Sequence, residues 1–214
     1  MKLISVLIFL INLHNVIKCR PIIIAHRGAS GYLPEHTLES KVMAYMMNAD
    51  FIEQDVVLTK DNVPIVLHDI YLDEVTDVAT KYPNKKNTTT NRFYAIDFSL
   101  DEIKSLLVTE RSVYPDRFPI KQSSFQISTL EEEIQLIKGL NKAFDSIYSL
   151  DTSGRLRSNR TQPGIYVELK RTDFHKSRNK TNFSEIVLDL LRKYNYTSYH
   201  DKCILQCFEA EELM

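Results

Sequence analysis

Four apolar runs along the chain each end in charged or imidazole side chains. Each run is rich in β-branched and other apolar residues, which is typical of a strand buried on both faces of a parallel sheet. The polar residues at or near their ends are His26 and Arg27, Glu53 and Asp55, His68 and Asp69, and Glu168 and Lys170. Because a β/α barrel keeps its active site at the carboxyl ends of its strands, this pattern predicts an α/β barrel with a polar site at one rim.

The acidic residues in these runs predict a metal site. Residues two apart in a strand point to the same face and lie roughly 6.6 Å apart, so Glu53 and Asp55 can share one cation. Glu53, Asp55 and Glu168 could also be ordinary residues of a solvated strand face, but their neighbours on both sides are apolar. Buried carboxylates are costly unless they are paired or bind a metal. An all-oxygen set suits Ca²⁺ or Mg²⁺ rather than Zn²⁺, since no Cys/His cluster has the spacing of a zinc site.

Between the third and fourth runs the sequence is less regular. Residues from about 70 to 126 are mostly polar and too long for a simple connection, which indicates an inserted segment. Within and after it, Ser99 with Glu102 and Thr129 with Glu132 have the spacing of capping boxes, and each predicts the start of a helix. A fifth strand is predicted from Lys202 and a further helix from Glu209. The second and third runs are close enough to favour a hairpin.

These motifs together resemble the glycerophosphodiester phosphodiesterase family. The matching residues are His26-Arg27-Gly28 with Pro34-Glu35, Glu53-x-Asp55, His68-Asp69 and Glu168-x-Lys170. The stretches around Tyr71, Tyr94 and Leu205-Gln-Cys-Phe look like the bacterial periplasmic branch of that family. The resemblance implies a TIM (β/α)8-type barrel of the PLC-like phosphodiesterase kind, with the second and third runs both in the barrel wall and the inserted segment over its mouth.

The resemblance also implies metal-dependent hydrolysis of glycerophosphodiesters to sn-glycerol 3-phosphate and an alcohol. Two rim histidines, His26 and His68, are then the acid/base pair, although a lone strand histidine is more often a satisfied core residue. Arg27 and Lys170 are either internal salt-bridge partners or the cations that neutralise the phosphate. Two alternatives remain open: a related phospholipase such as a sphingomyelinase D, and a non-catalytic binding or surface protein.

Other side chains near the motifs are expected to have supporting roles. Glu35 and Asp69 should orient loops or the His and Arg side chains. Gly28 permits close approach of the backbone to a ligand. His36 lies in a loop and is given no role.

Composition limits the partners. The chain has 214 residues, 43% of them hydrophobic, and a formal net charge of −1, which fits one globular domain at residues 20–214. No basic excess is available for nucleic acid, so we expect a small-molecule substrate and predict no protein partner. Residues 1–19 have the charged start and short apolar run of a signal peptide, too short for a stable membrane span. We therefore expect a secreted, extracellular or periplasm-like protein, and five N-x-Ser/Thr sequons agree with export.

The number of strands is smaller than a closed barrel requires. An eight-stranded barrel takes ~250 residues, whereas only about five barrel strands are predicted here, near residues 21, 51, 64, 164 and 202. We expect an incomplete barrel, with sheet edges that favour aggregation or pairing with another chain. The 214-residue chain alone is accordingly expected to be poorly soluble or self-associated, with little or no phosphodiesterase activity.

Overall fold

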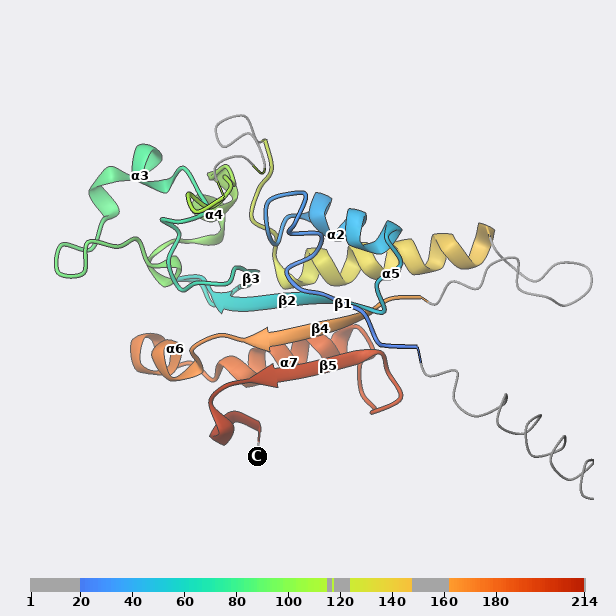
Figure 1. Cartoon of the computed structure of the whole chain (residues 1–214). Helices are drawn as coiled ribbons and strands as arrows, with labels where there is room; N and C mark the ends of the chain where they lie inside the picture. Colours follow the sequence, from blue (N-terminus) through green and yellow to red (C-terminus); the bar gives the residue numbers. More distant parts are fainter. Residues whose placement is uncertain (1–19, 115–116, 118–123, 148–161, 214) are drawn as a thin grey trace, which may run out of the picture.

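The structure is a computed structural model that describes residues 20–114, 117, 124–147 and 162–213. The predicted signal peptide lies outside the described residues. Five strands form one sheet: β1 (Ile24–Ala25), β2 (Phe51–Leu58), β3 (Pro64–Val66), β4 (Gly164–Leu169) and β5 (Cys203–Cys207). β1, β2, β4 and β5 lie side by side in that order and are parallel. The predicted α/β architecture with parallel strands is confirmed (Figure 1). Of the parallel strands, β2 and β4 are buried as predicted, whereas β1 and β5 are partly exposed, so the predicted burial of the first run was wrong.

β3 does not extend the parallel wall. It pairs antiparallel with the end of β2, with Val66 opposite Val56. The turn between them includes Asn62, whose positive φ of 60° is tolerated better by Asn than by most residues. The placement of this strand in the barrel wall was therefore wrong, and the hairpin that the short separation favoured is correct. The reversal has a consequence for the site, because it returns the chain to Asp55, whose carbonyl accepts the Leu67 N–H at 2.9 Å.

Helices cover the sheet and lead into its strands. They are α2 (Leu38–Met46), α3 (Val78–Lys81), α4 (Leu100–Ser105), α5 (Leu130–Ile147), α6 (Thr172–Asn179) and α7 (Phe183–Lys193), with 3₁₀ turns η1 (Pro83–Lys85), η2 (Ala95–Asp97) and η3 (Ala210–Leu213). Both predicted capping boxes are present: Ser99 caps α4 reciprocally with Glu102. Thr129 and Glu132 exchange the same pair of bonds at the start of α5, at 3.1 and 2.8 Å.

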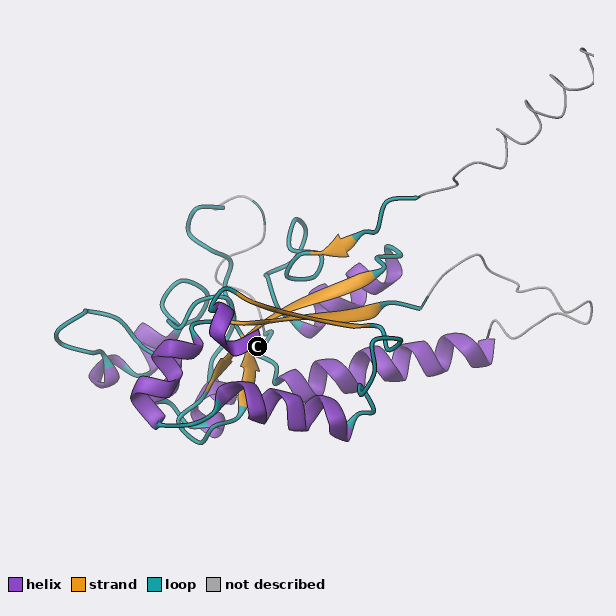
Figure 2. Ribbon diagram, turned by 90° about the horizontal axis from the view of Figure 1, so that it is seen from below, coloured by secondary structure: helices purple, strands orange, loops and turns teal. Residues whose placement is uncertain are grey.

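The main core lies between the sheet and the long helices (Figure 2). Alternate residues of β2 and β4, including Ile52, Val56, Ile165 and Val167, share this core with apolar residues of α5 and α7. Because side chains alternate along a strand, the residues between them project from the opposite face. That opposite face carries Glu53, Asp55 and Glu168, and it forms the floor of the site described below.

The inserted segment is more ordered than its polar composition indicated. It contains α3, η1, η2 and α4 and forms a second buried apolar cluster around Phe93, Phe98, Ile103 and Leu106. Val57 and Ile65, in the β2–β3 hairpin, also belong to this cluster. Most of its described backbone is irregular as expected, but the buried cluster was not foreseen, because its apolar residues are widely spaced in sequence and meet only in the fold. Figure 1 shows the segment beside the carboxyl ends of the strands.

None of the helices among the described residues has the length and apolar composition needed to cross a bilayer.

The two ends of the strand order expose apolar side chains. Of the described strands, β1 and β5 have one neighbour each. Ile22, just before β1, is 68% exposed, and Phe208, just after β5, is 79% exposed. Strand edges of this kind pair with other chains unless they are blunted by charge.

We expect the purified 214-residue chain to elute above its monomer mass of 24.9 kDa in size-exclusion chromatography with light scattering. Ile22→Lys should reduce this association, because an edge charge opposes strand pairing. Met47→Lys is the matched control, since Met47 is 54% exposed but lies at the end of α2. A wild-type monomer at high concentration, or an equal effect of both substitutions, would contradict the role of the edge.

Candidate active site

The register of β2 and β4 brings the acidic residues together. Asp55 is paired directly with Glu168, and Glu53 with Tyr166, so the three carboxylates share one face as predicted. This face forms one side of a cavity of about 440 Å³. Its lining residues are Ile24, His26, Glu53, His68, Tyr166, Glu168, Lys170, Gln206 and Phe208. Five of the seven residues that the sequence indicated therefore line the cavity. Asp55 and Arg27 lie behind this lining.

A sharp turn after β1 positions the His26-Arg27-Gly28 motif. Arg27 has a φ of 60°, an unusual left-handed conformation that directs its backbone N–H to Glu53 Oε2 at 2.5 Å. Gly28 has a φ of 80°, and a Cβ atom there would lie 2.2 Å from Ser40 Oγ on α2. The structure thus explains Gly28 by the close approach of α2, whereas the sequence suggested approach to a ligand.

The two carboxylates on β2 have oxygens that suit a cation. Glu53 and Asp55 are 3% and 1% exposed. Glu53 Oε1 and Asp55 Oδ1 accept no hydrogen bond from any residue that the structure describes. Orphaned buried carboxylate oxygens are costly, and a hard divalent cation satisfies them. The residues present therefore fit the divalent metal that the acidic pattern predicted.

The charges of the two carboxylates are strongly coupled. Burial and the neighbouring Asp55 carboxylate raise the pKa of Glu53 to about 8. Burial also disfavours the ionised form of Asp55, but the hydrogen bond from His36 and the charge of Lys170 outweigh it and lower the Asp55 pKa. The protein alone therefore holds one of these carboxyl groups neutral at pH 7, and a cation between them would favour ionisation of both.

Glu168 is held by two neighbouring side chains on the same wall of the cavity. Lys170 Nζ donates to Glu168 Oε1 at 2.6 Å and lies 3.6 Å from Asp55 Oδ1. Gln206 of β5 donates to Glu168 Oε2 at 2.8 Å. Lys170 thus combines both readings of the sequence, since it is an internal salt-bridge partner whose ammonium group also lines the cavity.

The two candidate acid/base residues face the cavity in different environments. Burial and the Arg27 guanidinium lower the pKa of His26, which favours its neutral form at pH 7. His68 Nδ1 lies 2.8 Å from Asp69 Oδ1. Asp69 is also bonded by Arg111, so the carboxylate accepts and His68 Nδ1 donates, which leaves Nε2 of His68 for proton transfer.

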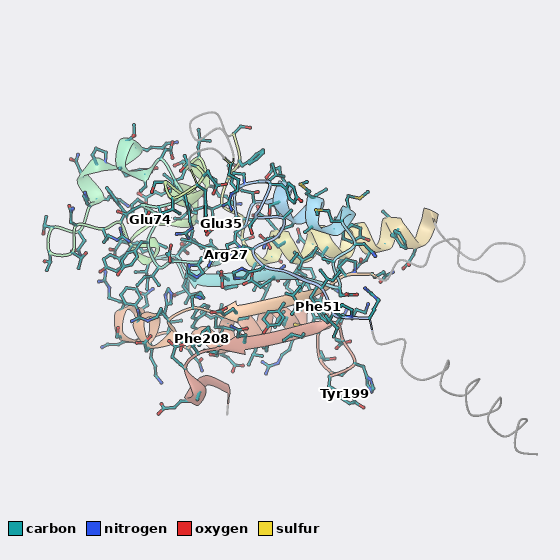
Figure 3. The ribbon with its side chains drawn as sticks, in the orientation of Figure 1. Arg27, Glu35, Phe51, Glu74, Tyr199 and Phe208 are labelled. Carbon is teal, nitrogen blue, oxygen red and sulfur yellow. The ribbon has the colours of Figure 1, made fainter. Side chains whose placement is uncertain are left out.

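An arginine from the inserted segment connects the two histidine motifs. Arg111 donates two bonds to Glu35, at 2.8 and 2.7 Å, and a third to Asp69 at 2.8 Å. Glu35 also accepts a bond from Arg27 Nη1 at 3.1 Å. Figure 3 shows Arg27 and Glu35 next to each other beside the inserted segment. The expected orienting roles of Glu35 and Asp69 agree with these contacts.

Arg111→Met should lower the free energy of unfolding by about 2–3 kcal/mol, the usual worth of hydrogen bonds to a charged group in partly buried surroundings. This loss of unfolding free energy should depend on pH, because Arg111 lowers the pKa of Glu35. Burial alone would raise the pKa of Glu35, but Arg111 and Arg27 lower this pKa from 4.5 to about 2. A lowered carboxyl pKa adds stability that is full above the unfolded value and is lost as the pH falls through the folded value.

Urea unfolding at several pH values tests this expectation. The difference between wild type and Arg111→Met should be full above pH 4.5 and shrink toward pH 2. Arg192→Met is the control, because Arg192 also contacts two carboxylates but lies on the exposed surface of α7. The control should leave the unfolding midpoint unchanged. Equal midpoints for wild type and Arg111→Met would show that the contact of Arg111 with Glu35 and Asp69 contributes no stability.

The family comparison agrees with this arrangement. Residues 26–214 match the model of the glycerophosphoryl diester phosphodiesterase family. The chain belongs to this family. The match begins at His26 and includes every residue that lines the cavity except Ile24.

Curated relatives carry the same family name over a longer chain. A glycerophosphodiester phosphodiesterase of Haemophilus influenzae is 44% identical over 212 residues, which covers 94% of this chain and 54% of the relative. One of Treponema pallidum is 39% identical and covers 89% of this chain and 51% of the relative. The chain therefore spans about half the length of the curated relatives that it matches.

Solved structures share the fold. A glycerophosphodiester phosphodiesterase of Agrobacterium tumefaciens aligns with a TM-score of 0.59 at 22% identity, over 90% of this chain and 60% of that one. A phosphodiesterase of Oleispira antarctica, solved in complex with the product sn-glycerol 3-phosphate, aligns with a TM-score of 0.60 at 23% identity, over 90% and 60%. The structure thus has the TIM-barrel fold of this phosphodiesterase family, with four parallel strands among its described residues.

Several residues of the family site were missed by sequence reasoning. His36 was given no role, yet its Nε2 lies 2.9 Å from Asp55 Oδ2 and its side chain is 3% exposed. Arg111 was not considered, because no nearby motif marks it. Gln206 had a signal, since it lies within the matching stretch after Leu205, but polar strand residues are common. These contacts join segments far apart in sequence, so spacing alone does not reveal them.

Proposed function

We propose that the chain carries the catalytic site of a metal-dependent enzyme that hydrolyses glycerophosphodiesters to sn-glycerol 3-phosphate and an alcohol. The observation that carries the proposal is the single cavity lined by His26, His68, Glu53, Glu168 and Lys170. The names of the relatives and the product named for the Oleispira antarctica structure support this substrate class. The bacterial periplasmic branch remains the proposed position within the family.

Glu53, Asp55 and Glu168 would hold the cation, and their all-oxygen chemistry favours Ca²⁺ or Mg²⁺. When bound, such a cation supplies positive charge to a phosphate oxygen and to a hydroxyl of the glycerol. The orphaned oxygens of Glu53 and Asp55 support this assignment.

The histidines divide the proton transfers. His26, kept neutral by its lowered pKa, takes the proton from the attacking hydroxyl or water. His68 in its doubly protonated form, with Nδ1–H donated to Asp69, delivers the Nε2 proton to the leaving alkoxide and is left as the neutral Nδ1–H tautomer. The two rings receive different roles because their surroundings differ: burial and Arg27 act on His26, whereas Asp69 accepts a hydrogen bond from His68.

The two cations stabilise charge on the phosphate. Lys170 lines the cavity, and its ammonium group, which donates to Glu168, would also be placed to donate to a phosphate oxygen there. Arg27 is held by Glu35 and lies 3.6 Å from Asp55, behind the lining. From this position the Arg27 guanidinium would stabilise negative charge in the site without touching the phosphate. Direct contact with the phosphate would require a change in the Arg27 side-chain conformation.

A phospholipase acting on intact lipid is the second candidate. Phe208, Ile22 and Ile23, at or near the cavity and the sheet edge, are more than half exposed, and such apolar surface suits an acyl chain. The polar lining on β2 and β4 favours the deacylated diester, which presents glycerol hydroxyls, phosphate and an alcohol headgroup and has no acyl chain. A non-catalytic binding protein is the third possibility that the assay must separate.

The test compares glycerophosphocholine, lysophosphatidylcholine and sphingomyelin as substrates, with and without a chelator. We expect release of sn-glycerol 3-phosphate from glycerophosphocholine, dependent on Ca²⁺ or Mg²⁺. Cleavage of the lipids in preference would favour the phospholipase. Binding of glycerophosphocholine without turnover, at enzyme in excess over substrate, would favour the non-catalytic protein.

We also propose that the chain is exported. The charged start and apolar run of residues 1–19 support this proposal. Fractionation of expressing cells, with N-terminal sequencing of the mature protein, tests it. Retention in the cytosol with residues 1–19 intact would contradict it.

A further inference from the structure

Three buried side chains, one of which lines the cavity, have the geometry of a mixed nitrogen and oxygen metal site. His36, Glu53 and Asp55 each offer one ligand atom, and these atoms lie within 4.8 Å of one another. Imidazole with carboxylates suits Zn²⁺ and other transition metals, whereas carboxylates alone suit Mg²⁺ and Ca²⁺. The chemical state of His36 therefore decides which class of metal the site prefers.

Lys41 on α2 lies directly against the His36 ring. Lys41 is fully buried, and its Nζ lies 3.1 Å from His36 Nδ1. It also bonds the backbone carbonyl of Glu53 and lies 3.4 Å from Glu133 Oε2 on α5. An ammonium group has three N–H donors and no acceptor. Lys41 donates to the Glu53 carbonyl and directs a second N–H at His36 Nδ1, while Glu133 Oε2 is an ion-pair partner that accepts no hydrogen bond among the described residues. His36 Nδ1 must therefore accept from Lys41.

This contact fixes the position of the ring proton. When Nδ1 of a neutral imidazole accepts, the hydrogen is on Nε2. His36 Nε2 lies 2.9 Å from Asp55 Oδ2, so it donates to that carboxylate. A nitrogen that carries a hydrogen has no lone pair for a metal, so His36 orients Asp55 and does not ligate.

We infer that Lys41 sets the metal selectivity of the site, because it holds His36 in the Nε2–H tautomer and leaves only carboxylate oxygens for a cation. The inference rests on the metal site of the proposed function. Lys41 is a positioning residue in this role, since it acts through His36. It would select Ca²⁺ or Mg²⁺ over Zn²⁺.

A purely structural role for Lys41 is the alternative. Glu133 is fully buried and its Oε1 accepts a bond from Ser128 at 2.7 Å, so Lys41 and Glu133 also connect α2 with α5. A structural ion pair predicts lower stability on substitution of either partner. It predicts no dependence of metal preference on His36.

The first experiment measures the His36 tautomer in the metal-free wild-type chain. Long-range ¹H–¹⁵N correlation spectra distinguish the two ring nitrogens, and His36→Asn assigns the signal. We expect the Nε2–H tautomer. A population dominated by the Nδ1–H tautomer would overturn the inference. Neither substrate nor turnover is needed, so a failure of the proposed activity leaves this result interpretable.

The second experiment replaces Lys41 by Gln, whose side-chain oxygen can accept a bond from Nδ1–H. Metal-ligating histidines almost always donate their second ring nitrogen in this way, and outer-shell changes of this kind shift metal affinity about 10–100-fold. We expect Lys41→Gln to tighten Zn²⁺ binding at least about tenfold in chelator competition, with no gain for Ca²⁺. An unchanged Zn²⁺ to Ca²⁺ preference in a folded Lys41→Gln protein would overturn the inference.

The double variant Lys41→Gln with His36→Asn is the control, because it removes the imidazole. The gain in Zn²⁺ affinity should disappear in it, and persistence of the gain would assign the metal to other ligands and overturn the inference. Circular dichroism establishes that each variant folds. Glu133→Gln provides the second variant: it retains the contact of Lys41 with His36 and should keep the wild-type tautomer and preference. A switch to the Nδ1–H tautomer in Glu133→Gln would also contradict the assignment to Lys41.

Discussion

His26→Ala and His68→Ala are each expected to lower kcat for glycerophosphocholine by roughly 10²–10⁴-fold, the usual loss when one partner of an acid/base pair is removed. Both rings line the cavity, and neither belongs to the two buried apolar clusters. The fold should therefore survive either substitution. The effect should fall on kcat, because proton transfer stabilises the transition state more than the bound substrate.

Single-turnover assays with enzyme in excess over substrate measure this loss even when the basal rate of the chain is low. His200→Ala is the matched control, because His200 is exposed in the loop before β5 and does not line the cavity. It should retain the wild-type rate. Near-normal turnover in either site variant would remove that histidine from the mechanism.

Replacing Glu53 by Gln together with Asp55 by Asn is expected to raise the dissociation constant for Ca²⁺ or Mg²⁺ by more than about 100-fold. Loss of an outer-shell partner alone costs about 10–100-fold, and this double substitution removes two proposed ligands. Both side chains keep their size and place, so the backbone bond from Arg27 to position 53 can remain. Turnover should be lost in parallel with metal binding.

Titration calorimetry measures the affinity without any assay of turnover. Glu39→Gln with Asp101→Asn is the control, since both acids are exposed on the first turns of α2 and α4. That control should bind metal as the wild type does. Unchanged affinity in the Glu53 and Asp55 double variant would show that the metal lies elsewhere.

Glu53 and Asp55 also predict that the stability of the metal-free protein depends on pH. The pKa of Glu53 is raised to about 8 from 4.5, chiefly by burial and then by Asp55. A raised carboxyl pKa adds stability that is full below the unfolded value and is lost as the pH rises through the folded value. Chelated wild-type protein should therefore lose stability between pH 4.5 and 8, and Glu53→Gln should flatten this decline in urea unfolding.

Some sequence predictions were confirmed because they depend on local rules. Alternation along β2 places Glu53 and Asp55 on one face whatever the rest of the chain does. The register of β2 with β4 then adds Glu168 to that face. The capping boxes at Ser99 and Thr129 are contacts within one helical turn. The family resemblance was confirmed by the match over residues 26–214.

Other predictions failed where two sources of information disagreed. The short link between β2 and β3 favoured a hairpin, but the resemblance placed both in the wall, and the antiparallel pairing of Val56 with Val66 shows that the local signal was right. The prediction for the inserted segment rested on the polar residues that make up most of it. Its stability comes from a minority of apolar residues, such as Phe93 and Phe98, that converge from distant positions.

The sequence by itself determined the fold class, the face of the sheet that carries the acids and the two histidines at the rim. Each of these follows from periodicity within one segment. Only the tertiary structure decided the connections among them: Arg111 reaches Glu35 across 76 residues, and Lys41 approaches His36 and Glu53 at once. Hydrogen bonds and buried charges act over a few ångströms, and the chain separations involved leave no period in the sequence. The chemical state of the site, including which nitrogen of His36 carries its hydrogen, is therefore a property of packing between segments.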